Sequence, residues 1–305
     1  MKHILSSLQF KKEDLEKILK RASVMEGQCK SGKIKKLLED KIIACIFFEP
    51  STRTRLSFEA AALKLGAKVI SAENAMESSS AFKGENIGDT TRILCSYADV
   101  VVIRHPQAGV VEAVAKISTK PMINAGDGAN QHPSQALLDL YTIKKEHGRL
   151  SNLQIAFGGD LLNSRTMRSL VPLLAFYLKN KFYFVSPKEL AISREFRNYL
   201  TKNKISFEET SNLEKILSKV DVLYMTRVQK ERFASSRTYE KVKDLFILKN
   251  AHLKFLKKNA IIMHALPKVN EIEADVDLDS RATYFRQAQN GLYVRMALFL
   301  YVFGL

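Results

Sequence analysis

The sequence predicts an α/β fold with two domains, each a parallel sheet flanked by helices, joined by interdomain helices. Two observations carry this prediction. Short runs rich in β-branched residues alternate with helix-length segments, and parallel strands require helical crossovers of that kind. The alternation begins again near residue 153, and 305 residues are enough to bury a separate core in each of two domains.

Four predicted strands fall in the first part of the chain. They are KIIACIFF (41–48), KVISA (68–72), VVVIRH (100–105) and PMINA (121–125). The segments between them, TRLSFEAAALKLG, GDTTRILCSYA and GVVEAVAKIS, have the length and the apolar spacing of crossover helices. These β/α units predict a first domain over residues 1–131.

The same pattern predicts five strands in the second part of the chain. They are LQIAFGG (153–159), KFYFVS (181–186), ISFEE (205–209), VLYMT (222–226) and AIIMHA (260–265). A helix-length segment separates each strand from the next. Ligands of open parallel sheets bind beyond the carboxyl ends of the strands, so residues that directly follow a strand are the candidates for chemistry.

The joint between the two domains is predicted to be helical. No glycine- or serine-rich linker occurs, and 13 glycines in 305 residues fall below the average of about 7%. The segment 132–147 has the length of a joining helix, and the second domain then covers residues 132–285. A closing apolar helix is expected from about Asn290, and the segment 286–305 is expected to pack back on the first domain.

Composition excludes several classes of protein. With 46% hydrophobic and 26% charged residues, the chain is globular rather than disordered. Its 3 cysteines lack C-x-x-C spacing, which argues against a disulfide framework and a thiolate zinc site. No apolar run approaches the roughly 18 residues of a membrane span, and the start becomes charged too early for a secretory leader. We expect a cytoplasmic protein without a metal site of its own.

The net charge of +16 indicates either an anionic partner or merely a soluble surface. A nucleic-acid-binding protein is the alternative that this charge suggests. Lysines and arginines are however interleaved with acidic residues, as in KKEDLEK and KIKKLLEDK, and no nucleic-acid-binding motif is present. We therefore expect neither a nucleic acid nor a membrane as partner.

The first predicted strand leads into FFEPSTRTR, which places three hydroxyl groups and two arginines at the start of a helix. Ser51 and Thr52 can cap that helix, its dipole favours an anion, and Arg53 offers a bidentate fork. An ordinary N-cap with solvated arginines is the simpler interpretation, but capping alone does not need so many polar groups. No Walker-type G-x-x-x-x-G-K is present, so a bound phosphate need not belong to a nucleotide.

Two further strand ends carry polar groups. Arg104 and His105 close the third strand, and His132 and Gln135 open the helix after the fourth. A helix N-terminus disfavours the cationic imidazole, so His132 is expected to stay neutral and to donate a hydrogen bond to a carbonyl group. His105 is expected to be structural. Pro133 fixes the turn that presents His132.

The chain is similar from end to end to the transcarbamylase family. The motifs that carry the resemblance are FFEPSTRTRLSFE, SSSAFKGE, RHPQ, GDGANQHPSQALLDL, YMTRVQKER and HALP. Lys83 in F-K-G-E and the T-R-V-Q-K-E-R segment resemble the aspartate branch of the family. The resemblance implies transfer of the carbamoyl group of carbamoyl phosphate to the amine of L-aspartate, giving N-carbamoyl-L-aspartate and phosphate in the second step of de novo pyrimidine biosynthesis. It implies no cofactor.

The resemblance also assigns roles in the first domain. The groups that would hold the phosphate are Ser51, Thr52, Arg53 and Thr54. Thr54, Arg104 and His132 would polarise the carbamoyl oxygen, and Gln135 would meet the carbamoyl nitrogen. The groups implied to be catalytic are Arg53, Thr54, Lys83, Arg104 and His132. Such a transfer needs no protein nucleophile, so catalysis would come from proximity and charge stabilisation.

Residues of the second domain would bind the two carboxylates of aspartate. By resemblance these are Arg165, after the first strand of that domain, and Arg227 with Gln229, after its fourth. Guanidinium forks match carboxylate geometry, whereas lysine offers only a point charge. Leu266 and Pro267 would offer backbone groups to the ligands.

The loop ENAMESSSAFKGEN carries Ser79 and Lys83. By resemblance these side chains reach the active site of a neighbouring subunit, which implies a homotrimer with shared sites. Ser78, Ser79 and Ser80 are consecutive, so the serine that enters the site stays open, although Ser79 has the spacing to Lys83 that the family pattern requires. The resemblance also leaves open whether regulatory chains bind.

Some positions depart from the family pattern. These are Leu162, Asn163, Ala265 and Lys268. They concern closure of the domains and cooperativity more than the chemistry. Glu49 is expected to pair with Arg165 or Arg232 of the other domain in a closed form.

Two alternatives lie closer to the family. An ornithine-using transcarbamylase would have to accept a cationic substrate, which Arg227 would repel. An inactive scaffold is disfavoured because every residue of the site pattern is present. An aspartate-using enzyme remains the prediction.

Overall fold

The computed structural model of the chain describes residues 2–75, 84–229, 239–240, 242 and 246–305. These residues form one parallel sheet of four strands and one of five, with helices as the connections. The predicted fold class is therefore confirmed. Each predicted strand is found, with bounds that differ from the expected ones by no more than about two residues.

The chain divides into two compact units. Unit 1 comprises Met1–Tyr141 and Gln289–Leu305, and unit 2 comprises Thr142–Ala288. Both divisions fall inside helices, because α6 spans Pro133–His147 and α11 spans Tyr284–Phe303. The chain passes between the units through helical segments, as the lack of a flexible linker indicates.

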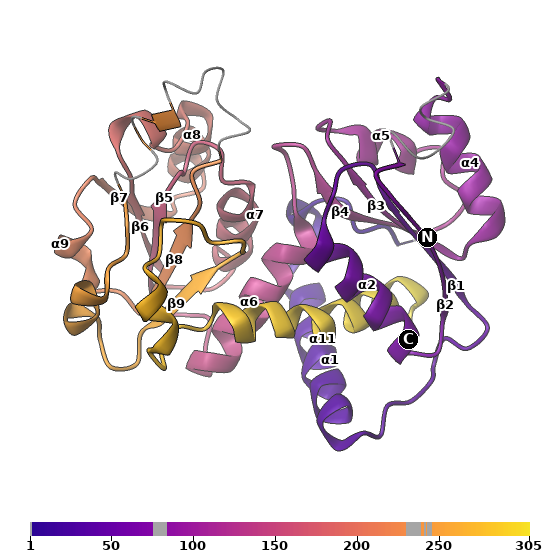
Figure 1. The fold of residues 1–305 in the computed structure, drawn as a ribbon, viewed down its shortest axis with the longest axis horizontal. Coiled ribbons are helices and arrows are strands. Elements are labelled where there is room, and N and C mark those ends of the chain that lie inside the picture. The colour runs from indigo at the N-terminus through magenta and orange to yellow at the C-terminus, as the bar shows by residue number, and fades with distance from the viewer. Residues whose placement is uncertain (1, 76–83, 230–238, 241, 243–245) are drawn as a thin grey trace. The chain divides into compact units, whose positions relative to one another are not determined.

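Unit 1 contains the four-stranded sheet, in the order β2-β1-β3-β4 (Figure 1). All neighbouring strands in it are parallel. Besides its parts of α6 and α11, its elements are η1 (Ser7–Gln9), α1 (Lys12–Ser31), β1 (Ile42–Phe47), α2 (Thr52–Lys64), β2 (Lys68–Glu73), α4 (Ile87–Tyr97), β3 (Val100–His105), α5 (Val110–Ala115) and β4 (Met122–Asp127).

Burial differs between the two edges of this sheet. Strand β2 is largely exposed, whereas β4 is buried throughout. The N-terminal segment covers β4: the Ile4 N–H donates to the Met122 carbonyl over 2.8 Å, and the Asn124 N–H donates to the Ile4 carbonyl over 2.7 Å. These bonds satisfy backbone groups that an open edge would leave unpaired.

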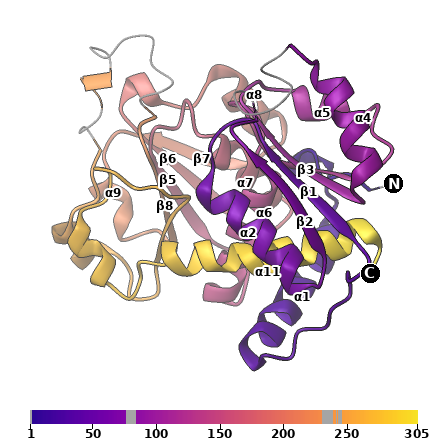
Figure 2. The same ribbon diagram turned by 45° about the vertical axis from the view of Figure 1, so that its right-hand side comes forward.

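The last turns of α11 pack against both α1 and α2 within unit 1 (Figures 1 and 2). The Phe299 ring meets the Phe58 ring edge-on at a centroid distance of 5.8 Å, and the Tyr301 hydroxyl donates to Asp14 over 3.0 Å. The expected start of this helix near Asn290 is wrong, because α11 begins at Tyr284. The mostly polar stretch RQAQN (286–290) follows its first two residues, so the apolar run that suggested the start marks only the later turns.

Unit 2 contains the five-stranded sheet, in the order β7-β6-β5-β8-β9, with all neighbours parallel. Its further elements are β5 (Gln154–Gly159), α7 (Arg165–Leu174), β6 (Lys181–Val185), η3 (Lys188–Leu190), α8 (Arg194–Lys202), β7 (Ser206–Thr210), α9 (Glu214–Leu217), β8 (Val222–Thr226), η5 (Asn250–Phe255), β9 (Ile261–His264) and η6 (Ala274–Leu278).

Aromatic rings fill the centre of unit 2. Phe157 of β5 stacks on Phe184 of β6 with centroids 6.1 Å apart, and it lies 5.5 Å from the Tyr224 ring of β8. All three side chains are fully buried. This packing holds the three central strands together, so the loops at their carboxyl ends start from a fixed framework.

Candidate active site

The anion loop of unit 1 lies between β1 and α2. Ser51 occupies the N-cap position of α2, but its side chain makes no capping hydrogen bond, so the expected cap is wrong. The first turn of a helix presents backbone N–H groups that have no acceptor within the helix. Thr52 and Arg53 are exposed there, and Thr54 is buried. The loop thus keeps the features of an anion site without the cap.

The two arginines of this loop differ in their surroundings. Arg55 is held inside unit 1, because its guanidinium donates to Glu59 over 3.0 Å and to Glu73 over 2.8 Å. Arg53 is solvent-exposed at the start of α2. Of the two, Arg53 is the more exposed.

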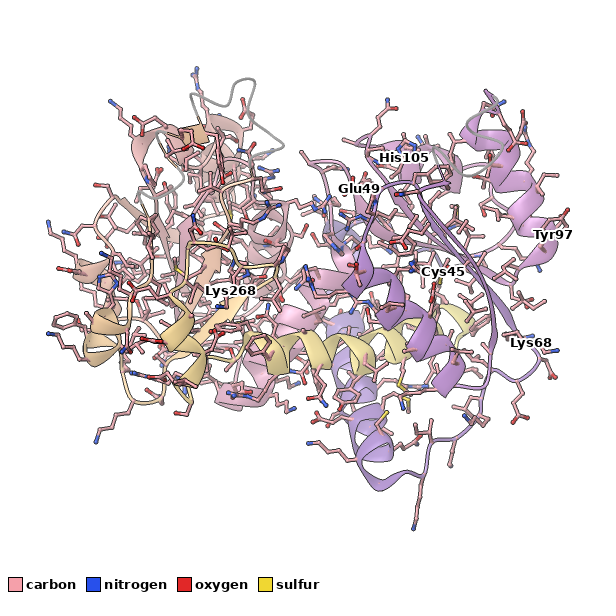
Figure 3. The ribbon with its side chains drawn as sticks, in the orientation of Figure 1. Cys45, Glu49, Lys68, Tyr97, His105 and Lys268 are labelled. Atoms are coloured by element: carbon pink, nitrogen blue, oxygen red, sulfur yellow. The ribbon has the colours of Figure 1, made fainter. Side chains whose placement is uncertain are left out.

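Arg104 ends β3 and is buried, with 9% of its surface exposed. Its guanidinium forms an ion pair with Glu49, which follows β1 directly. Figure 3 shows Glu49 and His105 at the same end of the sheet, past the strand that carries the buried Cys45. The sequence suggested Arg165 or Arg232 as partners of Glu49. The structure gives it a partner in its own unit, and Arg232 lies outside the described residues.

His132 and Gln135 stand at the start of α6. The His132 carbonyl accepts the N–H groups of Gln135 and Ala136 over 3.0 and 3.1 Å, so His132 begins the helix from its N-cap position. Its side chain is 4% exposed. The Gln135 side chain is buried and donates from Nε2 to Asp139 Oδ1 over 2.9 Å.

Asp127, at the end of β4, organises the loop that leads to His132. Its carboxylate accepts from the Gly109 N–H over 2.9 Å, from the Gln131 N–H over 3.0 Å and from Asn130 Nδ2 over 3.0 Å. Sequence analysis missed this residue. Its signal is a Gly-Asp pair directly after a strand, where a carboxylate can collect the N–H groups of a turn.

Gly128 holds two loops of unit 1 together. Its φ is +50°, and a Cβ atom there would lie 2.6 Å from the Pro106 carbonyl oxygen and 2.8 Å from the Ala108 nitrogen. Only glycine allows this approach. The turn after Arg104 and the turn before His132 are thereby fixed against each other.

His105 has a structural environment. Its ring lies 5.2 Å from the Phe48 ring, and its Nδ1 accepts the Gln107 N–H over 3.0 Å. Burial lowers the pKa of its imidazole. The neutral ring packs against the sheet and supports the turn that follows Arg104.

At the carboxyl edge of the unit 1 sheet, polar groups from three strand ends therefore gather. Strand register places Phe47 beside Arg104 and His105 beside Asp127. The predicted residues that the structure brings to this edge are Ser51, Thr52, Arg53, Thr54, Arg104, His132 and Gln135. Ser79 and Lys83 lie outside the described residues.

In unit 2, Asp160 follows β5 and ties two loops together. It is fully buried, and it accepts from the backbone and side chain of Asn163 and from the Gln229 N–H over 3.4 Å. Burial raises the pKa of this carboxyl group, although the hydrogen bonds oppose that shift. Gln229 Nε2 in turn donates to the Asn163 carbonyl over 3.1 Å. Asn163, a departure from the family pattern, thus links the loops of Arg165 and Arg227.

Arg165 and Arg227 stand at neighbouring strand ends of unit 2. Arg165 is the first residue of α7, and Arg227 follows β8, whose Thr226 pairs in register with Gly159 of β5. Both side chains are partly exposed. The hydrogen bonds of Asp160, Asn163 and Gln229 fix the loops that carry them.

The segment after β9 forms a tight turn at Leu266 and Pro267. Leu266 has a φ of +55° and precedes a cis peptide bond. Its N–H donates to His264 Nδ1 over 2.8 Å, and His264 Nε2 lies 2.7 Å from the Glu271 carboxylate. Both side chains of that pair are buried. Lys268, another departure from the family pattern, pairs with Asp277 over 3.1 Å.

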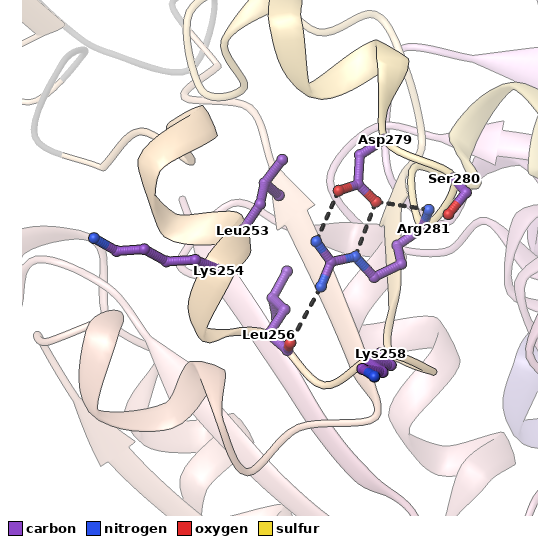
Figure 4. A pocket seen from close by; sticks show the side chains of 7 residues that line it. All are labelled: Leu253, Lys254, Leu256, Lys258, Asp279, Ser280 and Arg281. Atoms are coloured by element: carbon purple, nitrogen blue, oxygen red, sulfur yellow. Dashed lines mark hydrogen bonds and ion pairs between the residues drawn. The ribbon is translucent and has the colours of Figure 1, made fainter.

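A shallow pocket of unit 2 lies apart from these residues (Figure 4). Its volume is about 410 Å³, and its lining residues are Leu253, Lys254, Leu256, Lys258, Asp279, Ser280 and Arg281. The Arg281 guanidinium is bound to Asp279 over 2.7 and 2.9 Å and to the Leu256 carbonyl over 3.1 Å. None of the predicted site residues lines this pocket.

The described residues contain no group of three or more His, Cys, Asp or Glu side chains that could hold a metal ion. None of the helices in the described part of the chain is long and apolar enough to cross a membrane.

Comparison with known proteins assigns the family. The model of the aspartate/ornithine carbamoyltransferase carbamoyl-P binding domain matches residues 2–145, and that of the Asp/Orn binding domain matches residues 151–302. The chain belongs to the aspartate/ornithine carbamoyltransferase family. The family predicted from the sequence motifs is thereby confirmed.

Relatives of this carbamoyltransferase chain include aspartate carbamoyltransferase 1, chloroplastic, of Pisum sativum, which is 47% identical over 97% of this chain and 77% of its own length. The catalytic subunit of M. jannaschii aspartate transcarbamoylase superposes with a TM-score of 0.92 at 46% identity, covering 100% of this chain and 98% of the other. Aspartate transcarbamoylase from Trypanosoma cruzi in complex with N-(phosphonacetyl)-L-aspartic acid has a TM-score of 0.91 at 37% identity, with coverages of 98% and 94%.

Proposed function

We propose that this chain transfers the carbamoyl group of carbamoyl phosphate to the amine of L-aspartate, which gives N-carbamoyl-L-aspartate and phosphate. The main support for this function is that the anion loop, Arg104 and His132 all lie at the carboxyl edge of the unit 1 sheet. An anion site beside donors for a carbonyl oxygen is the arrangement that an acyl phosphate requires.

Each group at this edge has a defined task. The first turn of α2 and Arg53 bind the phosphate, which is also the leaving group. Thr54, Arg104 and His132 donate toward the carbamoyl oxygen, where negative charge develops as the amine attacks. Gln135 binds the carbamoyl nitrogen. No protein nucleophile is needed, because the amine of aspartate attacks the carbonyl carbon itself.

Unit 2 binds the amino acid. Arg165 and Arg227 offer guanidinium forks to the two carboxylates, and Gln229 and the backbone at Leu266 and Pro267 complete the contacts. These guanidinium heads repel a cationic side chain, which favours aspartate over ornithine.

The assembly proposed from the motif resemblance is a homotrimer with shared sites, to which Ser79 and Lys83 contribute from a neighbouring subunit. The reaction belongs to pyrimidine biosynthesis, and the setting is the cytoplasm. The three cysteines of the described structure are unpaired, which suits a reducing compartment.

The test of the function is an assay of carbamoyl phosphate with a panel of amines. We expect rapid release of phosphate with L-aspartate and formation of N-carbamoyl-L-aspartate in equal amount. D-aspartate and L-ornithine serve as controls for the stereochemistry and for the second carboxylate. Turnover of ornithine in preference to aspartate would refute the assignment of unit 2.

A further inference from the structure

Arg295 is a buried cation in α11 of unit 1. Only 3% of its surface is exposed, and its Nε has no hydrogen-bond partner among the described residues. Burial lowers the pKa of its guanidinium to about 10, with the charge of Asp139 opposing that shift. Arg295 therefore remains charged at neutral pH. A buried charge is costly unless an opposite charge compensates it, so its place in the fold requires a reason.

The helix is shaped to hold this guanidinium. A Cβ atom at position 291, one turn before Arg295, would lie 2.3 Å from Arg295 Nη1 and 3.2 Å from Leu138 Cδ2 of α6. Gly291 thus leaves the space that the guanidinium fills beside α6. The guanidinium group is therefore part of the packing between α6 and α11.

Arg295 lies against α2 and is near enough to α6 for the charge of Asp139 to act on it. Its guanidinium carbon lies 4.9 Å from the centroid of the Phe58 ring, and Phe58 stands four residues after Thr54 on α2. Asp139, whose charge acts on Arg295, stands four residues after Gln135 on α6. Residues four apart share one face of a helix. On each helix, the residue that interacts with Arg295 therefore lies one turn after a candidate site residue: Phe58 after Thr54 on α2, and Asp139 after Gln135 on α6.

The link to Gln135 decides how its amide is turned. Gln135 Nε2 donates to Asp139 Oδ1 over 2.9 Å, and both side chains are buried. An ionised carboxylate only accepts hydrogen bonds, so the amide must direct its NH₂ group to Asp139. The Gln135 oxygen then faces the other way, as an acceptor.

We propose that Asp139, compensated by Arg295, is a positioning residue that turns the Gln135 oxygen toward the ligand, so that the site selects an acyl phosphate bearing N–H. This inference rests on the proposed function, in which Gln135 meets the carbamoyl nitrogen. An amide oxygen accepts a hydrogen bond from an NH₂ group but not from a methyl group. The pair Asp139 and Arg295 thereby distinguishes a carbamoyl group from an acetyl group.

The test uses two ligands that differ only at that position. Phosphonoacetamide and acetonylphosphonate share the phosphonate and the carbonyl group, and one carries NH₂ where the other carries CH₃. We expect the wild-type chain in titration calorimetry to bind the amide about tenfold more tightly, equivalent to about 1.4 kcal/mol. In Asp139→Asn the Gln135 amide can turn over, and we expect the two affinities to become nearly equal.

A purely structural role would weaken both ligands alike. Leu140→Ala is the matched control, because Leu140 is fully buried on the same helix and takes no part in the contact. We expect it to lower Tm while the ratio of the two affinities stays as in the wild type. A wild-type ratio in Asp139→Asn, or equal affinities in the wild type itself, would overturn the proposal.

A double variant covers the case in which a single variant does not fold. Asp139→Leu with Arg295→Met removes both buried charges together, and replacing buried charges of opposite sign by apolar residues of similar volume is often neutral for stability. We expect this variant to fold and to bind both ligands with similar affinity. If it folds and keeps the wild-type preference for the amide, the charges do not position Gln135.

The binding measurement contains no aspartate, so it tests the role of Asp139 independently of the proposed transfer reaction. A chain that prefers phosphonoacetamide but transfers nothing to aspartate would contradict the reaction and leave the role of Asp139 supported. A chain that forms carbamoyl aspartate yet shows no preference between the ligands would contradict only the role of Asp139.

Discussion

Among the candidate site residues of unit 1, Arg104 has the most fully defined surroundings. It is buried at the end of β3, and its ion pair with Glu49 compensates a charge that would otherwise be costly to bury. In the proposed reaction the same guanidinium donates to the carbamoyl oxygen. The arginine is therefore held in place by a carboxylate before it meets the developing oxyanion.

We expect Arg104→Ala to lose about 10² to 10³ in kcat, the usual effect of removing one donor from an oxyanion site. Arg53→Ala should also lose most activity, together with affinity for phosphate. Steady-state kinetics and circular dichroism would measure activity and folding together. Arg92→Ala is the control, because its pair with Asp89 on α4 is exposed. Near-normal turnover in Arg104→Ala or Arg53→Ala would contradict their roles.

Arg227 is the residue of unit 2 with the sharpest kinetic prediction. Its head is partly exposed while the loop beneath it is fixed by Asp160 and Gln229. We expect Arg227→Ala to raise the KM for aspartate by about 10²-fold, the loss of a charged hydrogen bond of roughly 3 kcal/mol. The KM for carbamoyl phosphate should change little. Equal changes in both constants would show that Arg227 does not read a carboxylate.

Among the structural elements, the loops that follow β4 and β5 share one device. A Gly-Asp pair stands at the end of each strand, and the aspartates Asp127 and Asp160 are buried beneath the loop that they organise. Their carboxylates collect N–H groups from the turns and so fix the backbone that carries His132 in unit 1 and Arg165 in unit 2. The positions of the candidate site residues in each unit are thus fixed by carboxylates that do not contact the substrates in the proposed reaction.

The turn after β9 is stabilised by a different pair. The Glu271 carboxylate lies 2.7 Å from His264 Nε2, and the other ring nitrogen of His264 accepts the Leu266 N–H. Burial by itself would raise the pKa of the Glu271 carboxyl group, but its interaction with His264 and the hydrogen bond from the Val269 N–H outweigh burial and lower that pKa. A carboxyl group with a lowered pKa stabilises the fold above its unfolded pKa, and this contribution is lost as the pH falls through the folded value.

We therefore expect Glu271→Gln to be less stable than the wild type near pH 7, by about 2 kcal/mol. This difference should begin to shrink as the pH falls below about 4.5, where the carboxyl group of the unfolded chain takes up its proton, and should vanish once the pH has passed below the lower pKa of the folded state. Unfolding temperatures of both chains between pH 7 and pH 3 provide the measurement, with the exposed Glu112→Gln as control. A difference that does not depend on pH would exclude a role for the charge of Glu271.

At the scale of the whole molecule, the sequence predicted the architecture well. The strands of the described residues are marked by short runs rich in β-branched or aromatic residues, and the absence of a flexible linker indicated helical joints such as α6. The candidate residues of unit 1 were singled out because they lie at or after strand ends, and those of unit 2 were assigned by the motif resemblance. These features are local in the sequence, so periodicity and composition reveal them.

The remaining features depend on contacts between distant segments. Glu49 and Arg104 are 55 residues apart, and Phe58 and Arg295 meet only after α11 has packed on α2. Ser51 follows the capping pattern, yet its side chain does not cap. The start of α11 was missed because a mostly polar stretch, RQAQN (286–290), separates its first two residues from the apolar run. No local pattern distinguishes a buried arginine from an exposed one.

The proposed sharing of sites within a homotrimer makes the last prediction. Variants His132→Ala and Lys83→Ala should each be inactive alone, because each removes a catalytic group from every site. If Lys83 enters the site of a neighbouring subunit, random exchange of equal amounts of the two variants leaves about one site in four with both groups intact. We expect about a quarter of the wild-type activity after dissociation and reassembly. Mixing His132→Ala with Arg104→Ala is the control, since both groups lie at the same sheet edge and no intact site can form. Absence of regained activity in the first mixture, with trimers present, would mean that Lys83 serves its own subunit.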